Sequence, residues 1–238
     1  MHKTVAETRA LLRELHARPL PRHVDVVVAP PFTALAAAHE ELTESPIALG
    51  AQNVHEFTHG PFTGEISPVM LHELGVRFVI VGHSERRAAG ETDADVNRKV
   101  HACLAHGLTP IVAVGETKDE HLAHRTHDRV TAQTRAAFEG VDAAAAARCV
   151  VAYEPIWAIG TGLSDSPDNA NGVIAEIRAA VDGLASARLL YGGSMKGENA
   201  PALMAQPDID GGLIGGASLT AHAFLEVIDA AGAATSAR

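Results

Sequence analysis

Hydrophobic residues in this chain gather in seven short runs that are apolar at nearly every position. Strands of a parallel sheet show this pattern because helices cover both of its faces. We therefore predict strands at residues 24–29, 47–51, 77–82, 110–115, 149–154, 188–192 and 210–215. Their alternation with helical patterns indicates an α/β fold, and we expect one domain over residues 1–238 because no linker rich in Pro, Gly and Ser divides the chain.

Between these runs, apolar residues recur at helical spacing. We predict helices at about 33–41, 67–74, 93–106, 120–139, 168–183, 198–205 and 217–231.

A further helix opens the chain. Thr4 is a candidate N-cap with Glu7 as its capping-box partner, and Leu11, Leu12 and Leu15 form its apolar stripe. No strand pattern precedes this helix, although most αβ domains start with a strand.

Composition narrows the class of protein. A length of 238 residues fits an α/β barrel, which runs to about 250 residues as one unit. The net charge of −10 argues against a general binder of nucleic acid or anionic membranes, and no stretch approaches the ~20 apolar residues of a membrane span. Cys103 and Cys149 form no C-x-x-C pair, so the sequence predicts neither a disulfide framework nor a zinc site. We expect a cytoplasmic protein.

Two ionisable residues stand at predicted strand ends. In a β/α barrel the carboxyl ends of all strands open onto one face, where functional residues gather. His83 follows the third strand and could act as an acid, a base or a neutral hydrogen-bond donor, although a structural role is the commoner one for a histidine at the rim. Glu154 closes the fifth strand, where partial desolvation makes a carboxylate a better base; a carboxylate that caps the next turn is the alternative.

Apolar and glycine-rich segments follow the later strands. Residues 155–162, PIWAIGTG, fit either a lid with hinges at its ends or a buried crossover. Glycine pairs at 192–193 and 215–216 end the last two strands, where a bare backbone can approach an anion. His121, His124 and His127 could partly share a helix face and weakly bind a transition metal. No carboxylate or cysteine completes a recognisable site, so an exposed polar face is the favoured interpretation.

Eight stretches together resemble one family, triosephosphate isomerase. They occur in the family's order and cover nearly the whole chain. The stretches are GAQNVH (50–55), GPFTGEISP (60–68), VIVGHSERR (79–87), GETDADVN (90–97), GLTPIVAVGE (107–116), AYEPIWAIGTG (152–162), YGGS (191–194) and GGASL (215–219).

The resemblance implies a (β/α)₈ TIM barrel that interconverts dihydroxyacetone phosphate and D-glyceraldehyde 3-phosphate through an enediol(ate), in glycolysis and gluconeogenesis. It implies no metal and no organic cofactor. By the resemblance, Glu154 is the base that moves the proton between carbons, His83 is the neutral electrophile, and Glu85 supports them. The implied substrate-binding residues are Gly160, Ser194, Leu213, Gly215 and Gly216. The implied lid is Pro155, Ile156, Trp157, Ala158, Ile159, Gly160, Thr161 and Gly162, and Thr63 lies in the loop (residues 53–64) that joins a homodimer.

The chain departs from the family at its start. Family members begin with a strand that ends in Asn-x-Lys, and Met1 matches the position just after that segment. We therefore expect the first strand and its catalytic lysine to be absent from this chain, which leaves seven strands and a gap in the barrel. Loss of such a cation typically costs ~10²-fold or more in rate. Lys3 is a candidate substitute, although a displacement of one helical turn would misplace its charge.

Two other functions stay open from the sequence. One is a non-catalytic barrel homologue that binds a ligand or partner. The other is a different phosphate-binding β/α-barrel isomerase, which the lid sequence and the pair of His83 and Glu154 disfavour.

Overall fold

Seven parallel strands make up the sheet in the computed structural model, which describes residues 1–159 and 165–236. The strands are β1 (Val27–Val28), β2 (Ala48–Ala51), β3 (Phe78–Val81), β4 (Thr109–Val114), β5 (Val150–Tyr153), β6 (Arg188–Tyr191) and β7 (Gly211–Gly212). They pair in chain order, and within the described ranges β1 and β7 do not pair with each other. This curled sheet confirms the predicted TIM-barrel class with seven strands and an open side.

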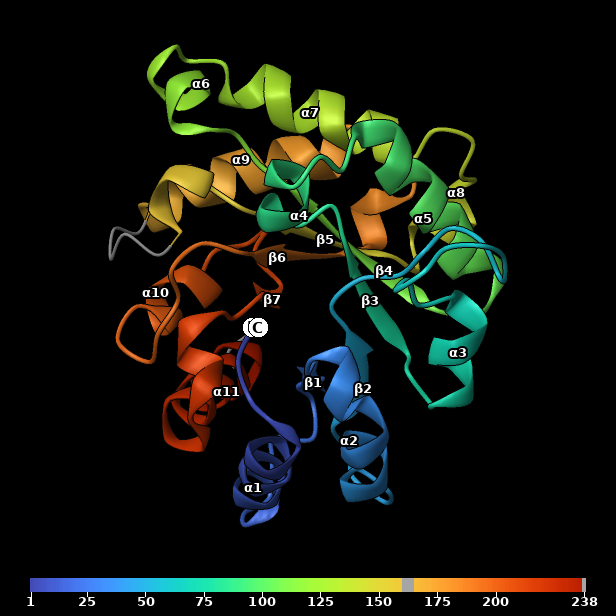
Figure 1. Ribbon diagram of the computed structural model, residues 1–238. Helices are drawn as coiled ribbons and strands as arrows, with labels where there is room; N and C mark the ends of the chain where they lie inside the picture. The colour runs from blue at the N-terminus through green and yellow to red at the C-terminus, as the bar shows by residue number, and fades with distance from the viewer. Residues whose placement is uncertain (160–164, 237–238) are drawn as a thin grey trace.

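Helices surround the sheet on its outer side (Figure 1). The α-helices are α1 (Val5–His16), α2 (Leu35–Glu41), α3 (Pro68–Glu73), α4 (Ser84–Ala88), α5 (Asp93–Ala105), α6 (Lys118–Leu122), α7 (Thr126–Ala137), α8 (Ala143–Ala146), α9 (Pro167–Ala179), α10 (Ala200–Met204) and α11 (Ala221–Ser236). Four 3₁₀ turns, η1 (Phe32–Ala34), η2 (Ile156–Ala158), η3 (Leu184–Ser186) and η4 (Gly216–Leu219), complete the described elements.

The opening helix α1 closes the helical layer across the open side of the sheet. It begins with the predicted capping box, in which Thr4 and Glu7 each satisfy a backbone N–H of the other. Leu12 and Leu15 are buried, and α1 contacts both α2 and α11 (Figure 1). Arg13 and Arg9 of α1 reach Glu41 of α2, and their hydrogen bonds hold the pKa of that carboxyl at about 2.

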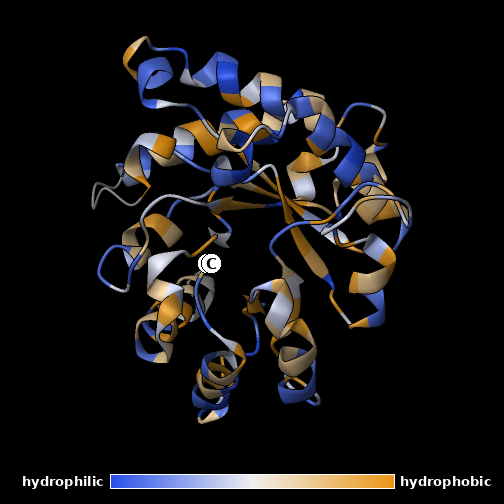
Figure 2. Ribbon diagram, viewed as in Figure 1, coloured by the Kyte–Doolittle hydropathy of each residue, from blue (hydrophilic) through white to orange (hydrophobic). Residues whose placement is uncertain are grey.

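The core has two parts. The larger part lies between the sheet and the helices, and Figure 2 shows that the strands are largely hydrophobic. The smaller part lies on strands β3 to β6 and contains Ile111, Val150 and Ala152, with Phe78 and Leu190 packed against it. In the part of the chain that the structure describes, no helix is long and apolar enough to cross a membrane.

One predicted helix is wrong. The helix expected over residues 120–139 is broken into α6 and α7, and His124 between them has a left-handed φ of 55°. Thr117 caps α6 by accepting the N–H of Glu120. The three histidines of this region therefore do not share one helical face. The sequence also missed α4, the short helix that follows β3.

Leu15→Ala should destabilise the chain by about 2–5 kcal/mol, because truncation of a fully buried leucine leaves a cavity beneath α1. Leu11→Ala removes the same atoms from a partly exposed position on the same helix and should cost clearly less. Urea unfolding measures both. Equal losses would show that α1 is not anchored by its buried stripe.

Candidate active site

His83 is the N-cap of helix α4. Gly82 follows β3 with a left-handed φ of 74°, and this turn brings His83 to the start of the helix. The backbone N–H of Glu85 donates to Nδ1 of His83 at 3.2 Å. Nδ1 therefore carries a lone pair, and the neutral ring holds its hydrogen on Nε2.

Glu154 lies directly after β5 with its carboxylate buried, only 2% exposed. Its Oε1 is 2.9 Å from Nε2 of His83. Its Oε2 accepts the backbone N–H of Ser84 at 2.9 Å. The two strand-end residues that the sequence singled out are thus in direct contact, and the start of α4 supplies both donors that compensate the buried carboxylate.

Two influences oppose each other at His83. Burial lowers the pKa of the imidazole, whereas its hydrogen bond to Glu154 and the charge of that carboxylate raise it. Together the two effects of Glu154 outweigh burial, so the pKa lies above its ordinary value. The charge of Glu85 also raises it. A neutral group that replaced the carboxylate at Nε2 would therefore lower the pKa and favour the neutral ring.

Two glycines make room for Glu154. A Cβ on Gly115 would lie 1.8 Å from the carbonyl oxygen of Glu154, and a Cβ on Gly192 would lie 2.9 Å from its Cγ. These glycines directly follow β4 and β6, the strands on either side of β5. A side chain at Gly115 is therefore incompatible with this backbone arrangement.

A buried ion pair holds the turn before His83, and the sequence reasoning missed it. Glu91 accepts the N–H of Gly82 at 2.9 Å through Oε2 and pairs with Lys99 through Oε1. The ammonium of Lys99, on α5, also donates to Asn53 at 2.8 Å. The sequence signal for this ion pair is Lys99 itself, which stands among the buried positions of α5, since a buried lysine needs an acidic partner.

The segment after Glu154 is tied down through the indole of Trp157. Its Nε1–H donates to Oε1 of Glu116 at 2.7 Å, and Tyr153 donates to the same oxygen at 3.2 Å. Glu116 is fully buried after β4, and burial raises the pKa of its carboxyl. Of the expected lid, residues 155–159 are described, whereas Gly160, Thr161 and Gly162 lie outside the described residues.

The predicted anion-binding turns follow β6 and β7, which are neighbours in the sheet. Ser194 donates its hydroxyl to the carbonyl of Ala158 at 3.1 Å. At Gly215 and Gly216 a Cβ would meet nothing within 4 Å, so the backbone there is open to approach. Leu213 lies in the sequence between these two turns and is partly buried. Its N–H donates to the backbone carbonyl of Tyr191 at 2.9 Å.

Lys3 and Thr63 fall in different places. Lys3 has a left-handed φ of 73°. Hydrogen bonds from Thr4 lower the pKa of Glu7 in α1, and the charge of Lys3 has a smaller effect in the same direction. Thr63 is exposed in the long connection between β2 and α3.

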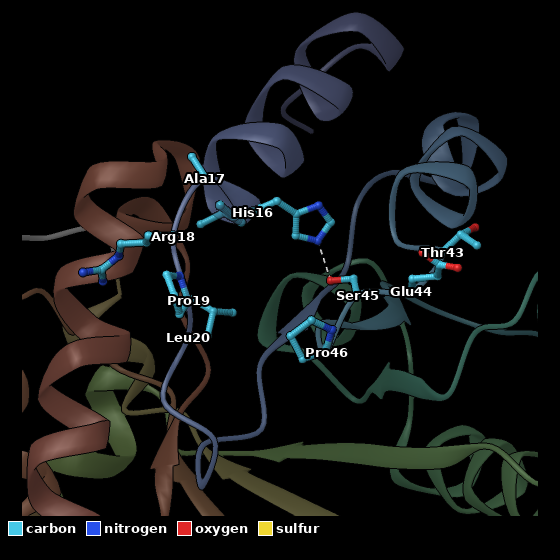
Figure 3. Close-up of a pocket in the computed structure, with 10 residues that line it drawn as sticks. His16, Ala17, Arg18, Pro19, Leu20, Thr43, Glu44, Ser45 and Pro46 are labelled. Atoms are coloured by element: carbon cyan, nitrogen blue, oxygen red, sulfur yellow. Dashed lines mark hydrogen bonds between the residues drawn. The ribbon is translucent and has the colours of Figure 1, made fainter.

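A cavity of about 470 Å³ lies away from these residues (Figure 3). Its lining residues lie at the C-terminal ends of α1 and α2. His83 and Glu154 lie at the other rim, where the strands end. His16 points across it and hydrogen-bonds to Ser45, while Arg18 turns outward and pairs with Asp229 at 2.6 Å (Figure 3). The polar groups of this cavity are therefore largely bonded to the chain itself.

Comparison with known proteins gives a consistent result. A sequence profile described as triosephosphate isomerase matches residues 1–231. A triosephosphate isomerase of Chloroflexus aurantiacus is 52% identical, over 96% of this chain and 94% of that protein. Those of Roseiflexus castenholzii and Alkaliphilus metalliredigens are 50% and 48% identical, over 96% of this chain and 93% and 95% of the respective proteins.

Gly115→Ala should displace Glu154, because the new methyl group collides with its backbone and the neighbouring strand must shift. We expect a loss of catalytic rate of about 10²-fold or more, since catalysis is sensitive to displacements of ~1 Å. Gly172→Ala, in the middle of α9 with open space around it, is the matched control and should leave the rate unchanged. Steady-state rates of the two variants decide, and an unimpaired Gly115→Ala enzyme would contradict this geometry.

Proposed function

The chain belongs to the triosephosphate isomerase family, and we propose that Glu154 and His83 carry out the two kinds of proton transfer in its reaction. The reaction interconverts dihydroxyacetone phosphate and D-glyceraldehyde 3-phosphate. It requires a base that removes a proton from one carbon and returns it to the next, and a donor that polarises the carbonyl. The observation that supports these roles is the 2.9 Å contact between Oε1 of Glu154 and Nε2 of His83.

The substrate binds between His83 and Glu154 and replaces the contact between them. Its carbonyl oxygen accepts a hydrogen bond from Nε2 of His83, and Oε1 of Glu154 then faces the adjacent C–H. With a neutral carbonyl in place of the carboxylate, the imidazole loses the main influence that raises its pKa and stays neutral. The N–H of Glu85 on Nδ1 keeps the hydrogen on Nε2, and Ser84 keeps hold of the other carboxylate oxygen.

The phosphate lies at the turns after β6 and β7. Gly215 and Gly216 offer an open backbone, and Ser194 offers a hydroxyl that now donates to Ala158. Phosphate oxygens are strong acceptors of such N–H and O–H donors. Leu213 lines the site between these turns. Residues 155–162 act as the lid that excludes water, in which Gly160 also contacts the phosphate.

Glu154→Gln should lower kcat by about 10²–10⁴-fold, because the amide cannot accept the carbon-bound proton. His83→Gln should lower it by about 10²–10³-fold, as expected for loss of one donor to a developing oxyanion. Glu14→Gln, an exposed change on α1, is the control and should retain the rate. A coupled spectrophotometric assay measures all three.

The same assay tests the contribution of the lysine that the family resemblance implies. It compares this chain with a chain extended by an Asn-x-Lys strand. We expect the extended chain to be faster by ~10²-fold or more, as for other electrostatic groups at an oxyanion. Inactivity of both folded forms would favour a non-catalytic homologue. Equal activity of both forms would show that the lysine does not contribute to the rate.

We also propose a cytoplasmic homodimer joined through residues 53–64. Phe57 and Phe62 in this loop stack with ring centroids 5.1 Å apart, and His55 lies 4.2 Å from Phe62. Phe57 is 50% exposed, and Glu56 pairs with Arg98 of α5, so the loop presents a fixed aromatic surface. Exposed aromatic clusters are typical of protein interfaces.

Phe57→Asp should raise the dimer dissociation constant about 30-fold or more, since a charge replaces an aromatic contact at the interface. Leu122→Asp places the same charge at an exposed apolar position on α6 and should leave it unchanged. Sedimentation equilibrium measures both. A monomeric wild-type chain at micromolar concentration, or equal effects of the two substitutions, would contradict the proposed interface.

A further inference from the structure

One arginine joins the ends of two neighbouring strands near the active site. Arg87 lies in helix α4, and its side chain is 12% exposed. Each of its three guanidinium nitrogens donates to a different acceptor. Nε reaches the carbonyl of Gly82 at 2.7 Å, Nη2 the carbonyl of Ala113 at 3.3 Å, and Nη1 the carboxylate of Asp93 at 2.5 Å.

The guanidinium continues the connection between β3 and β4 beyond their backbone pairing. The register of these two strands ends at the pair of Val81 and Val112. Gly82 and Ala113 are the next residues along the chain, and Arg87 bridges their carbonyls. A planar guanidinium holds its donors in a fixed fork, so it sets the separation of two acceptors more rigidly than a lysine ammonium does.

The turn at Gly82 fits closely around this guanidinium. A Cβ at Gly82 would lie 3.0 Å from Nη2 of Arg87 and 3.0 Å from the carbonyl oxygen of Ala113. The N–H of Gly82 donates to Glu91 at 2.9 Å, and its carbonyl accepts from Arg87. Because side chains bind both backbone groups of this glycine, the direction in which the chain enters His83 is fixed from two sides.

The end of β4 in turn positions Glu154. The N–H of Glu154 donates to the carbonyl of Val114 at 2.7 Å. A Cβ on the next residue, Gly115, would lie 1.8 Å from the carbonyl oxygen of Glu154. Gln133 of α7, which is 1% exposed, accepts the N–H of Gly115 at 2.8 Å and holds this segment from the helical layer. A shift of the β4 end relative to β3 would therefore change the distance between His83 and Glu154.

We propose that Arg87 is a positioning residue for the isomerase reaction, which sets the spacing of His83 from Glu154 by joining the end of β3 to the end of β4. The inference rests on the roles that the proposed function gives to these two residues. Oε1 of Glu154 and Nε2 of His83 are 2.9 Å apart, and the reacting carbon and carbonyl oxygen of the substrate bind between the same two groups. Catalysis is sensitive to displacements of ~1 Å, so a change in this spacing lowers the rate.

Arg87→Lys tests the connection, because the ammonium keeps the charge but cannot bridge three separated acceptors. We expect kcat to fall about 10-fold to 10²-fold. The affinity for glycerol 3-phosphate, which cannot isomerise, should stay close to that of the wild-type chain, since the proposed phosphate turns follow β6 and β7. Asp93→Ala removes one of the three partners and should lower kcat less. It also carries every measurement if Arg87→Lys does not fold.

Arg178→Lys is the matched control. Arg178 on α9 likewise donates to backbone carbonyls, including that of Ala187 at 3.0 Å, and pairs with Asp208 and Asp210. Its side chain is 19% exposed, close to the value for Arg87. Both substitutions should lower stability in urea unfolding, but only Arg87→Lys should lower kcat. Equal losses of kcat in the two variants would overturn the positioning role, because they would reflect stability alone.

The ¹⁵N NMR signals of the imidazole test the position of His83 without turnover. Ring nitrogen shifts report which nitrogen carries the hydrogen and how it is hydrogen-bonded, and the signals of His83 are identified by their loss in His83→Gln. At alkaline pH the wild-type chain and Arg178→Lys should give the same shifts, with the hydrogen on Nε2. Arg87→Lys and Asp93→Ala should displace the Nε2 signal. Identical His83 signals in the wild-type chain and Arg87→Lys would overturn the proposal.

The outcomes separate this inference from the proposed function. Loss of rate in Glu154→Gln and His83→Gln without loss in Arg87→Lys would leave the proposed function standing and overturn the role of Arg87. An unimpaired rate in His83→Gln would contradict the proposed function. The role of Arg87 in the reaction would then fall with it, even if the NMR signals of His83 moved.

Discussion

A carboxylate buried at the end of a strand needs hydrogen-bond donors, and the arrangement of the active site follows from this need. Glu154 finds its donors at the start of α4, where Nε2 of His83 and the N–H of Ser84 each hold one oxygen. These donors follow β3 and the carboxylate follows β5, and the two strands are two places apart in the sheet. Because parallel strands end at one rim, residues 70 positions apart in the sequence meet in one pair.

Each partner of this pair is fixed by a second layer of contacts. Gly82 directs the chain into α4, and its N–H donates to Glu91, which is itself paired with the buried Lys99. Gly115 and Gly192 leave the space that Glu154 fills. The chain therefore relies on backbone turns and buried charges to hold groups that catalysis needs within ~1 Å.

Much of this arrangement could be predicted from the sequence, because it depends on strand order. Apolar runs located all seven strands, and the positions of His83 and Glu154 after two of them predicted that they share a rim. The break between α6 and α7 could not be predicted from periodicity, since it depends on the left-handed turn at His124. The partners of Glu91 and Glu116 were also missed, because buried ion pairs and the indole contact join segments far apart in sequence.

The central claim is that Glu154 moves a proton between the two carbons of the substrate. The most direct test follows solvent deuterium by proton NMR while the enzyme acts on dihydroxyacetone phosphate in D₂O. A proton held on the carboxyl of Glu154 can exchange with solvent before it is returned, so the account predicts that a fraction of the aldehyde product carries deuterium at C2. It predicts that this labelled product is lost in Glu154→Gln. Equal labelling by the wild-type chain and Glu154→Gln would contradict the account.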